Sequence, residues 1–354
     1  MSLLSVLGAL LASPVAGADP ADRPIPAALA AHATDGADPA RAREFLASIR
    51  PSAALQQVLD QVVAEIGRSD PKLLTSSPRI AVIDLSTPVA PRLAHVRGME
   101  RVYPASVIKF VYLMAAHAWQ EQGRLRIDAQ LDAEIDAMIR HSSNQATRQV
   151  FARLTGTTPG AELEGNDYEV FRERRLAVKR WLETLGITDL HAVNPTYDGG
   201  GDLFGRDQQF LRDRSIAGGL PTGDGQYSNR TAMTADGTAR LLALLATDRA
   251  LSAKDSELVR QRMRRDVRQQ PYLSHRIAGG AAKLPGTEVY SKSGTWGPIY
   301  ADAGIVRHAD GRQFAIAVFT DASPPYRGDA IARITERVAA HLFEQAAATE
   351  KGPS

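Results

Sequence analysis

Apolar residues recur along the chain with two spacings, and each spacing is confined to certain segments. Between Ser52 and Ile66 they fall three and four positions apart, which predicts an amphipathic helix. Short apolar runs bounded by turn residues are instead typical of strands. The segments that fit a strand are 79–85, 92–96, 288–293, 303–307 and 314–321. The turn Asp310-Gly311 predicts a hairpin between the last two, and residues 329–343 predict a closing helix.

The middle of the chain is dominated by helical spacing. Helices are predicted at 107–119, 133–139, 145–154, 170–185, 234–245 and 252–263. The first of them is apolar on nearly all sides, so we expect it at the centre of the fold. Residues 187–229 carry clustered glycines and predict a long irregular region. Strands at both ends with helices between them predict a mixed α/β (α+β) fold, in which a helical lobe at about residues 106–285 is inserted into one sheet.

The first 50 residues differ in composition from the rest. A short apolar run, Leu3 to Val15, is followed by Ala16-Gly17-Ala18, which predicts a signal peptide over residues 1–18 and an exported protein, periplasmic or extracellular. The run is too short to span a bilayer stably. Residues 19–50 are rich in Ala, Pro and Asp and predict a linker, with a small helix at 39–48. A single domain is expected over residues 51–354.

Composition excludes several kinds of site. The 354 residues include no cysteine, which removes disulfides and cysteine-based metal sites. The eight histidines form no metal-binding motif, and the net charge of only +2 gives no nucleic-acid footprint. No G-x-S-x-G elbow and no phosphate-binding loop occurs. We therefore expect no metal, no cofactor and no nucleic-acid partner.

The candidate chemistry begins at Ser106, which follows Tyr103-Pro104 and opens the apolar helix. Lys109 lies three positions on, so both side chains rise from one helix face, where an amine beside a hydroxyl can activate it as a nucleophile. Ser106 could equally be a helix N-cap. A second S-x-x-K at Ser69 and Lys72 has no apolar helix after it and predicts a loop.

Two further motifs follow in order, Ser142-x-Asn144 and Lys292-Ser293-Gly294. With Ser106-x-x-Lys109 they resemble the penicillin-recognising serine hydrolases, and the class A β-lactamases most closely. The resemblance covers about residues 52 to 346. It implies a β-lactamase/transpeptidase-like fold with an antiparallel sheet, and a small-molecule β-lactam or peptidoglycan-like substrate.

The resemblance also implies roles for individual residues. Ser106 would form an acyl-enzyme, Lys109 would accept its proton, and Ser142 would pass a proton to the leaving nitrogen. Lys292 would supply positive potential. Substrate contacts would come from Asn144, Ser293, Gly294 and Thr295, with the backbone N–H groups of Ser106 and Thr295 forming an oxyanion hole. As alternatives, Ser142 and Ser143 could cap the next helix, Asn144 could be a turn residue, and Lys292 could be a strand-end charge. His141 is expected to support the site from outside or to lie on the surface.

The sequence departs from the class A pattern in the irregular region. The E-x-x-L-N loop, whose glutamate releases the acyl group, is absent between Gly186 and Asn229. Asp198 or Asp202 could replace that glutamate, or either could be a turn acid. Ala303 stands where an arginine usually grips the substrate carboxylate, and Arg327 is the candidate substitute.

Two more departures concern the cleft. Ser142 follows Ser106 by 36 residues, an interval shorter than is usual in class A, so a more open cleft is expected. Ser143 stands where an aspartate is usual. We expect an enzyme, a monomeric serine hydrolase of β-lactam amides. The alternatives are a penicillin-binding D-Ala-D-Ala peptidase-like enzyme with slow deacylation, and a non-hydrolytic cell-wall binding module.

Overall fold

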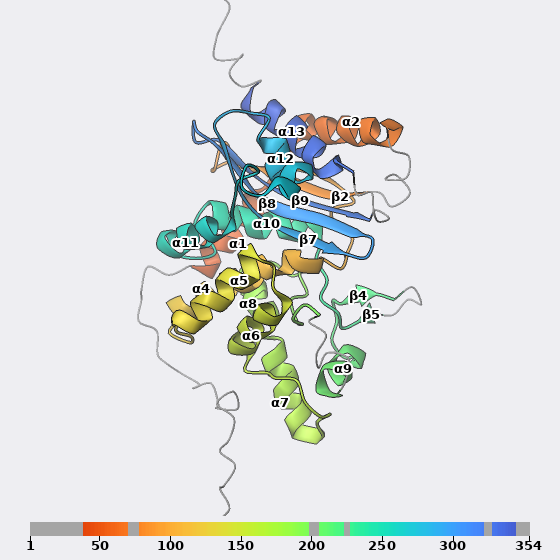
Figure 1. Cartoon of the computed structure of the whole chain (residues 1–354), viewed down its shortest axis with the longest axis vertical. Coiled ribbons are helices and arrows are strands. Elements are labelled where there is room, and N and C mark those ends of the chain that lie inside the picture. Colours follow the sequence, from red (N-terminus) through yellow and green to blue (C-terminus); the bar gives the residue numbers. More distant parts are fainter. Residues whose placement is uncertain (1–37, 70–77, 198–204, 223–226, 322–327, 345–354) are drawn as a thin grey trace, which may run out of the picture.

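A computed structural model describes residues 38–69, 78–197, 205–222, 227–321 and 328–344. Within these residues, seven strands from both ends of the chain form one sheet (Figure 1). In spatial order they are β1 (Arg50–Pro51), β3 (Arg92–Val96), β2 (Arg79–Asp84), β9 (Gln313–Asp321), β8 (Ile299–His308), β7 (Thr287–Trp296) and β6 (Arg264–Arg265). Every neighbouring pair is antiparallel except β1 and β3, which are parallel. The prediction of one sheet built from both chain ends is confirmed.

Both faces of the sheet are covered by helices. On one face lie α2 (Ala53–Ser69), α12 (Ile277–Ala281) and α13 (Ala330–Phe343), and they share a core with Val82, Ile316 and Val318. On the other face lies α10 (Ala235–Ala246), which packs against β2, β8 and β9. Strands buried on two faces need continuous apolar runs, which explains why β9 reads as apolar without alternation.

Most of the helical lobe lies below the sheet in Figure 1. Its buried residues form one hydrophobic core with α10 and the sheet face that α10 covers. Its helices are α4 (Lys109–Glu121), α5 (Ala129–Arg140), α6 (Asn144–Thr155), α7 (Gly165–Arg175), α8 (Ala177–Thr184), α9 (Gly205–Arg212) and α11 (Ala253–Met263). A small hairpin of β4 (Leu220–Pro221) and β5 (Tyr227–Ser228) lies apart from the main sheet. Helix α4 is buried almost throughout and contacts α5, α6, α8 and α11, so the expectation that it is central is confirmed.

Four expectations need correction. The helix predicted at 170–185 is two helices, α7 and α8, which meet at Leu176. The small helix predicted at 39–48 is confirmed as α1 (Pro39–Ser48), but the segment is more than a linker, because α1 buries Ala42 and Phe45 and β1 joins the sheet. The region 187–229 is not wholly irregular, because it contains α9 and the small hairpin. The helix of Ser106 begins as a short 3₁₀ turn, η2 (Ala105–Ile108), before α4.

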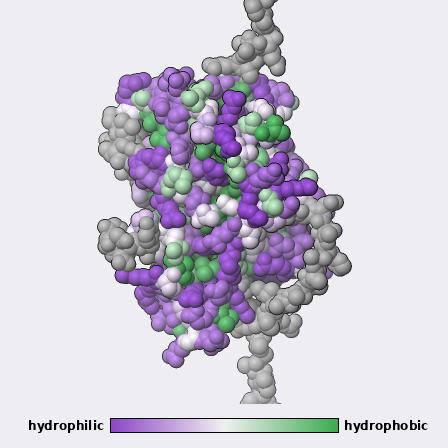
Figure 2. Space-filling view, turned by 180° about the vertical axis from the view of Figure 1, so that it is seen from behind, coloured by the Kyte–Doolittle hydropathy of each residue, from purple (hydrophilic) through white to green (hydrophobic). Residues whose placement is uncertain are grey.

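The face of the molecule seen in Figure 2 is mainly hydrophilic, with apolar residues in small separate groups. Among the described residues, no helix has the length and apolar character needed to cross a membrane. The predicted signal peptide, residues 1–18, lies outside the described residues.

Candidate active site

Ser106 lies in a tight turn between the sheet and the central helix. The turn η2 follows Pro104, and the backbone N–H of Lys109 donates to the carbonyl of Ser106. Ala105 has φ of 48°, one of only four positive values among the described non-glycine residues. Such a conformation costs about 1–3 kcal/mol and is characteristic of functional turns. Neither η2 nor α4 has a side-chain hydrogen bond at its N-cap, so Ser106 does not act as an N-cap. Its side chain is half-buried.

Lys109 is fully buried at the start of α4. Its Nζ donates to the carbonyl oxygen of Ser142 at 2.6 Å, to the Oγ of Ser142 at 3.3 Å and to the Oδ1 of Asn144 at 2.7 Å. No carboxylate is among these partners. The first two motifs, far apart in sequence, are thus joined through the lysine amine.

Ser142 lies between two amines. Its Oγ is 3.0 Å from the Nζ of Lys292, in addition to the contact with Lys109. Ser142 is a second residue with positive φ, at 54°. The capping role falls to the next residue, because the Oγ of Ser143 accepts from the N–H of Ala146 at the start of α6. Ser142 therefore contacts the two amines, whereas Ser143 caps α6.

The third motif, Lys292-Ser293-Gly294, lies in β7, which packs against the turn η2. Lys292 is 1% exposed, and its Nζ also donates to the carbonyl oxygen of Ser293 at 2.8 Å. A Cβ on Gly294 would lie 2.7 Å from the carbonyl oxygen of Pro104 and 3.1 Å from the backbone nitrogen of Ser106. Only glycine therefore lets the strand approach the turn this closely. Ser293 is half-buried and Thr295 is exposed.

Arg276 is a site residue that the sequence reasoning missed. It lies just before α12 and is 3% exposed. Its Nη2 donates to the Oγ1 of Thr295 at 2.7 Å, and its Nη1 donates to the carbonyl oxygen of Gly294 at 3.2 Å. The guanidinium stacks over the ring of Tyr300, 3.7 Å from its centroid. No motif surrounds Arg276, so only the fold reveals that it reaches the Lys292-Ser293-Gly294 strand.

Asn144 is held by the segment that follows α8. Its Oδ1 accepts from the Oγ1 of Thr196 at 2.9 Å, and its amide donates to the carbonyl oxygen of Tyr197. That segment rests on Asn194, whose side chain donates to the carbonyl oxygen of Asn229 at 2.8 Å. Asn144 is therefore a rigid partner for Lys109, and not a turn residue.

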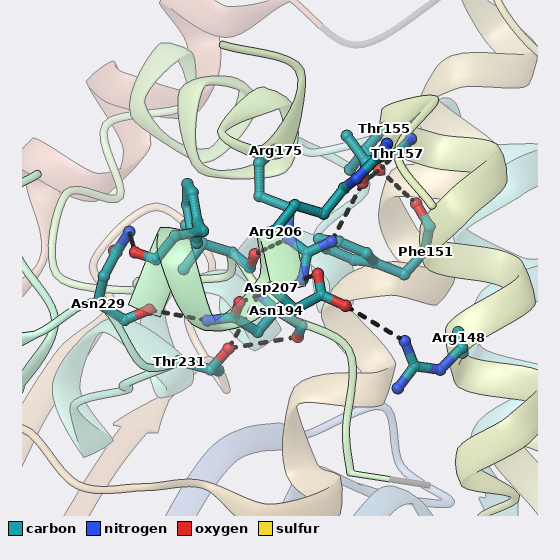
Figure 3. Close-up of polar contacts among 12 residues, drawn as sticks. Arg148, Phe151, Thr155, Thr157, Arg175, Asn194, Arg206, Asp207, Asn229 and Thr231 are labelled. Atoms are coloured by element: carbon teal, nitrogen blue, oxygen red, sulfur yellow. Dashed lines mark hydrogen bonds and ion pairs between the residues drawn. The ribbon is translucent and has the colours of Figure 1, made fainter. Parts of the chain in front are cut away.

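A buried arginine supports the same segment (Figure 3). The Nε of Arg175 donates to the carbonyl oxygen of Val193 at 3.0 Å. Its Nη2 lies 2.7 Å from the Oδ1 of Asp207 in α9, and both side chains are almost fully buried. The guanidinium also lies over the ring of Phe151, 5.1 Å from its centroid. This ion pair ties α6, α7 and α9 to the segment that positions Asn144.

Known proteins resemble the chain in both sequence pattern and fold. A sequence model of the β-lactamase enzyme family matches residues 174–342, just under half of the chain. A mutant of PBP-A, in an acyl-enzyme complex with penicillin G, is similar at 19% identity, covering 84% of this chain and 98% of that one, with a TM-score of 0.56. The fold of the chain is β-lactamase-like.

Two β-lactamases give similar values. A variant of the class A β-lactamase of the last common ancestor of Gram-negative bacteria is 17% identical, covers 83% of this chain and 100% of its own, and has a TM-score of 0.58. The β-lactamase of Sphaerobacter thermophilus is 17% identical, covers 79% and 96%, and has a TM-score of 0.53. No curated protein sequence matches the chain. The expected β-lactamase/transpeptidase-like fold is thus confirmed.

Burial dominates the electrostatics of the site. Burial lowers the pKa of Lys109 from 10.5 to about 7. Burial also lowers the pKa of Lys292 well below its usual value, and the nearby charges of Arg265 and Lys109 lower it further, whereas Asp302 raises it. Lys109 thus titrates near neutral pH, where a general base is most effective.

The end of β7 beyond the site is aromatic. Trp296, the last residue of β7, is 59% exposed and meets the ring of Tyr103 edge to face, with centroids 5.6 Å apart. Trp296 lies two positions beyond Gly294 and four beyond Lys292, so the three share one face of the strand. The described site is therefore cationic at one end and aromatic at the other.

Asp198, Asp202 and Arg327 lie outside the described residues. His141 is exposed at the end of α5. Within the described part of the chain, no three His, Asp or Glu side chains are grouped as metal ligands would be.

Proposed function

We propose that the protein is a serine hydrolase that forms an acyl-enzyme on Ser106, with a β-lactam or a related amide that carries a nearby carboxylate as substrate. The observation that carries this proposal is the placement of the Ser142 hydroxyl between two buried amines, beside the turn that presents Ser106. A hydroxyl bridging two amines can accept a proton from one side while it donates one on the other. Acyl transfer from nitrogen to oxygen needs this movement.

In the acylation step, the Oγ of Ser106 bonds to the carbonyl carbon and its proton passes to the neutral amine of Lys109. The proton then moves through the Ser142 hydroxyl to the leaving nitrogen, and the C–N bond breaks. The pKa of about 7 for Lys109 supports this route, because roughly half of the amine is neutral at pH 7.

The close approach of β7 and η2 supports an oxyanion hole formed by two backbone N–H groups. In an antiparallel strand, the N–H and C=O of one residue point to the same side, and the side alternates along the chain. The carbonyl of Ser291 faces away from β8, because Arg265 of β6 donates to it. Thr295, four positions on, therefore offers its N–H at the same edge, near the backbone nitrogen of Ser106. Each such donor contributes about 3–4 kcal/mol to acyl-transfer catalysis.

The substrate carboxylate would bind at the cationic end of the site. Lys292 supplies charge there, while Ser293 and Thr295 supply hydroxyls. We assign to Arg276 the arginine role for which the sequence suggested Arg327, because Arg276 already donates to the Thr295 hydroxyl. The acyl side of the substrate would face the aromatic pair of Tyr103 and Trp296.

Slow release of the acyl group is the second candidate behaviour. Thr196 and Tyr197 occupy the described segment nearest to Asn144, and neither can act as a carboxylate base. The structurally similar PBP-A mutant was trapped as an acyl-enzyme with penicillin G. Both observations favour a penicillin-binding enzyme that acylates well and deacylates slowly as the alternative to an efficient β-lactamase.

One experiment separates the candidates. The protein is mixed with a chromogenic cephalosporin, and both colour and intact protein mass are followed. Repeated turnover supports the β-lactamase, whereas a stable mass adduct that disappears in Ser106→Ala supports the slow enzyme. Ser69→Ala is the matched control, because Ser69 belongs to the other S-x-x-K and lies at the end of α2, where its hydroxyl donates to the carbonyl of Ile66 and accepts from Arg333. Absence of both colour and adduct at high ligand concentration would favour a non-hydrolytic binding module.

Export through residues 1–18 and a monomeric state belong to the same proposal. The apolar run followed by Ala16-Gly17-Ala18 supports export. Detection of the processed chain outside the cytoplasm, together with its mass in solution by light scattering, tests both.

A further inference from the structure

Strand β6 is only two residues long, and its two arginines have different surroundings. The side chain of Arg264 is 57% exposed and pairs with Glu288 at the surface. Arg265, the next residue, is only 8% exposed. The strand is held against β7 by the pairs of Arg264 with Tyr290 and of Arg265 with Val289. The backbone of β6 therefore delivers one arginine side chain to the interior beside the site.

The Arg265 guanidinium donates to two backbone carbonyls on different elements. Its Nε donates to the carbonyl oxygen of Ser291 in β7 at 2.9 Å, and its Nη2 donates to that of Ile139 in α5 at 3.0 Å. Ser291 directly precedes Lys292, and Ile139 lies three residues before Ser142. One planar group thus bridges the strand that carries the third motif and the helix that leads into the second motif.

An arginine suits this bridge better than a lysine would. Its N–H groups form a rigid fork, whereas an ammonium group is a single point of charge on a flexible stem. Burying a cation costs free energy, and hydrogen bonds from a charged donor are stronger than neutral ones, so the two carbonyls offset part of that cost. The two contacts therefore hold β7 and the end of α5 at a fixed separation.

The bridge spans the same two elements as a contact of the proposed mechanism. The Oγ of Ser142 lies 3.0 Å from the Nζ of Lys292 on β7 and 3.3 Å from the Nζ of Lys109 on α4. The N–H of Ser143 donates to the carbonyl of Ala137 in α5 at 3.1 Å, so the loop of Ser142 is bonded to the end of that helix. A shift of α5 relative to β7 would therefore lengthen the contact of this hydroxyl with Lys292.

We propose that Arg265 is a positioning residue for catalysis: by bonding the backbones of α5 and β7, it keeps the Ser142 hydroxyl within hydrogen-bond reach of both amines. The inference rests on the proposed function, in which Ser142 passes a proton to the leaving nitrogen. Arg265 acts through Ser142 and takes no part in the proton transfer itself. The contacts proposed for the substrate carboxylate come from β7 and Arg276, so they do not depend on the bridge.

This role predicts a selective loss of activity. Without the bridge, substrate binding should change little, because the carboxylate contacts remain. Cleavage of an amide needs a proton on the leaving nitrogen, whereas a nitrophenolate leaves an activated ester without one. Misplacing a reacting group by about 1 Å can cost about 100-fold in rate. Loss of the bridge should therefore slow acylation by an amide and spare acylation by an activated ester.

The test compares Arg265→Lys, which keeps the charge but lacks the fork, with wild type. The amide is penicillin G, and the ester is p-nitrophenyl phenylacetate, which carries the same acyl side chain. The acylation rate constant and the dissociation constant are measured separately by intact mass, and Ser106→Ala gives the background.

We expect penicillin G acylation to be at least about 30-fold slower in Arg265→Lys, with binding and ester acylation within about threefold of wild type. Arg264→Lys is the matched control and should behave as wild type, because it makes the same change on the same strand at an exposed side chain. An equal loss for both substrates, or no loss for either, would overturn the proposal.

A double-mutant cycle tests whether Arg265 acts through Ser142. Once Ser142→Ala has removed the hydroxyl, adding Arg265→Lys should slow penicillin G acylation by less than about threefold, whereas independent effects would multiply and contradict the proposal. Arg265→Met guards against misfolding, because it removes the cost of burying a charge while it fills a similar space. A folded Arg265→Met variant that penicillin G acylates at the wild-type rate would count against the bridge.

Amide hydrogen exchange gives a readout that needs no activity. In Arg265→Met the N–H of Ser143 should exchange at least about tenfold faster than in wild type, while amides in the middle of α6 stay protected. Unchanged exchange at Ser143 in the folded variant would refute the bridge. A wild-type protein that penicillin G fails to acylate would instead contradict the proposed function, and the exchange measurement would still test the placement of Ser142.

Discussion

Acylation of Ser106 should depend on pH through the neutral fraction of Lys109. Burial lowers the pKa of this amine to about 7, because its partners are a carbonyl, a hydroxyl and an amide oxygen, without a carboxylate. Only the deprotonated amine can accept the serine proton. At pH 5 about 1% of the amine is neutral, so acylation should be about 100-fold slower than on its plateau above pH 8. Each pH unit below 7 should cost about tenfold.

The assay is the second-order rate of adduct formation with penicillin G, followed by intact mass at constant ionic strength between pH 5 and 8.5. Lys109→Arg should acylate at least 100-fold more slowly at pH 7.5, because a guanidinium group cannot be deprotonated in a protein. Lys254→Arg, on the exposed side of α11, is the matched control and should behave as wild type. A flat profile between pH 5.5 and 8, or a Lys109→Arg variant within tenfold of wild type, would refute the assignment of Lys109 as the base.

Three further predictions concern the same site. Lys109→Met should raise stability at pH 6 by about 2 kcal/mol, because the lowered pKa of the buried amine costs on the order of 5 kcal/mol below pH 7 and lost hydrogen bonds offset part of the gain. The cost fades as pH rises from 7 towards 10.5, where the unfolded lysine also loses its proton, so urea unfolding at pH 6 and pH 9.5 should show the gain shrinking, and an equal gain at both would contradict the reasoning. Gly294→Ala should slow acylation at least 100-fold, since its Cβ would push β7 away from the backbone of Ser106, and penicillin G kinetics within tenfold of wild type would argue against the oxyanion hole. Arg276→Ala should raise KM for a substrate with a free carboxylate at least tenfold but leave its methyl ester almost unaffected, and an equal effect on both would exclude it as the carboxylate anchor.

The sheet could be predicted from the sequence because its strands are short apolar runs at both ends of the chain. The predicted 314–321 and the observed β9 (Gln313–Asp321) differ by one residue. Helix boundaries that depend on tertiary contacts were harder to predict from the sequence. The predicted helix 170–185 is divided at Leu176: α7 ends at Arg175, whose buried side chain pairs with Asp207 more than thirty positions away, and α8 starts at Ala177. No local pattern encodes such a contact.

Some residues of the candidate site could be predicted from the sequence, and others could not. Ser106, Lys109, Ser142 and Lys292 sit in short motifs whose order and setting were visible in the sequence. Arg276 has no motif, and its role depends on the path of the chain before β7 and on the ring of Tyr300 beneath it. Its contribution could be found only after β7 and β8 had been paired.

The arrangement of charges also explains how two lysines in one small volume can serve opposite purposes. Both amines contact the same hydroxyl of Ser142, so geometry alone does not distinguish them. Their surroundings do: Lys109 donates only to neutral oxygens, one helical turn from Ser106, whereas Lys292 lies on β7 beside Ser293, near the charges of Arg265 and Arg276. In the proposed mechanism, Lys109 is the amine placed to take the proton of Ser106, while Lys292 and the two arginines form the cationic end that a substrate carboxylate would meet.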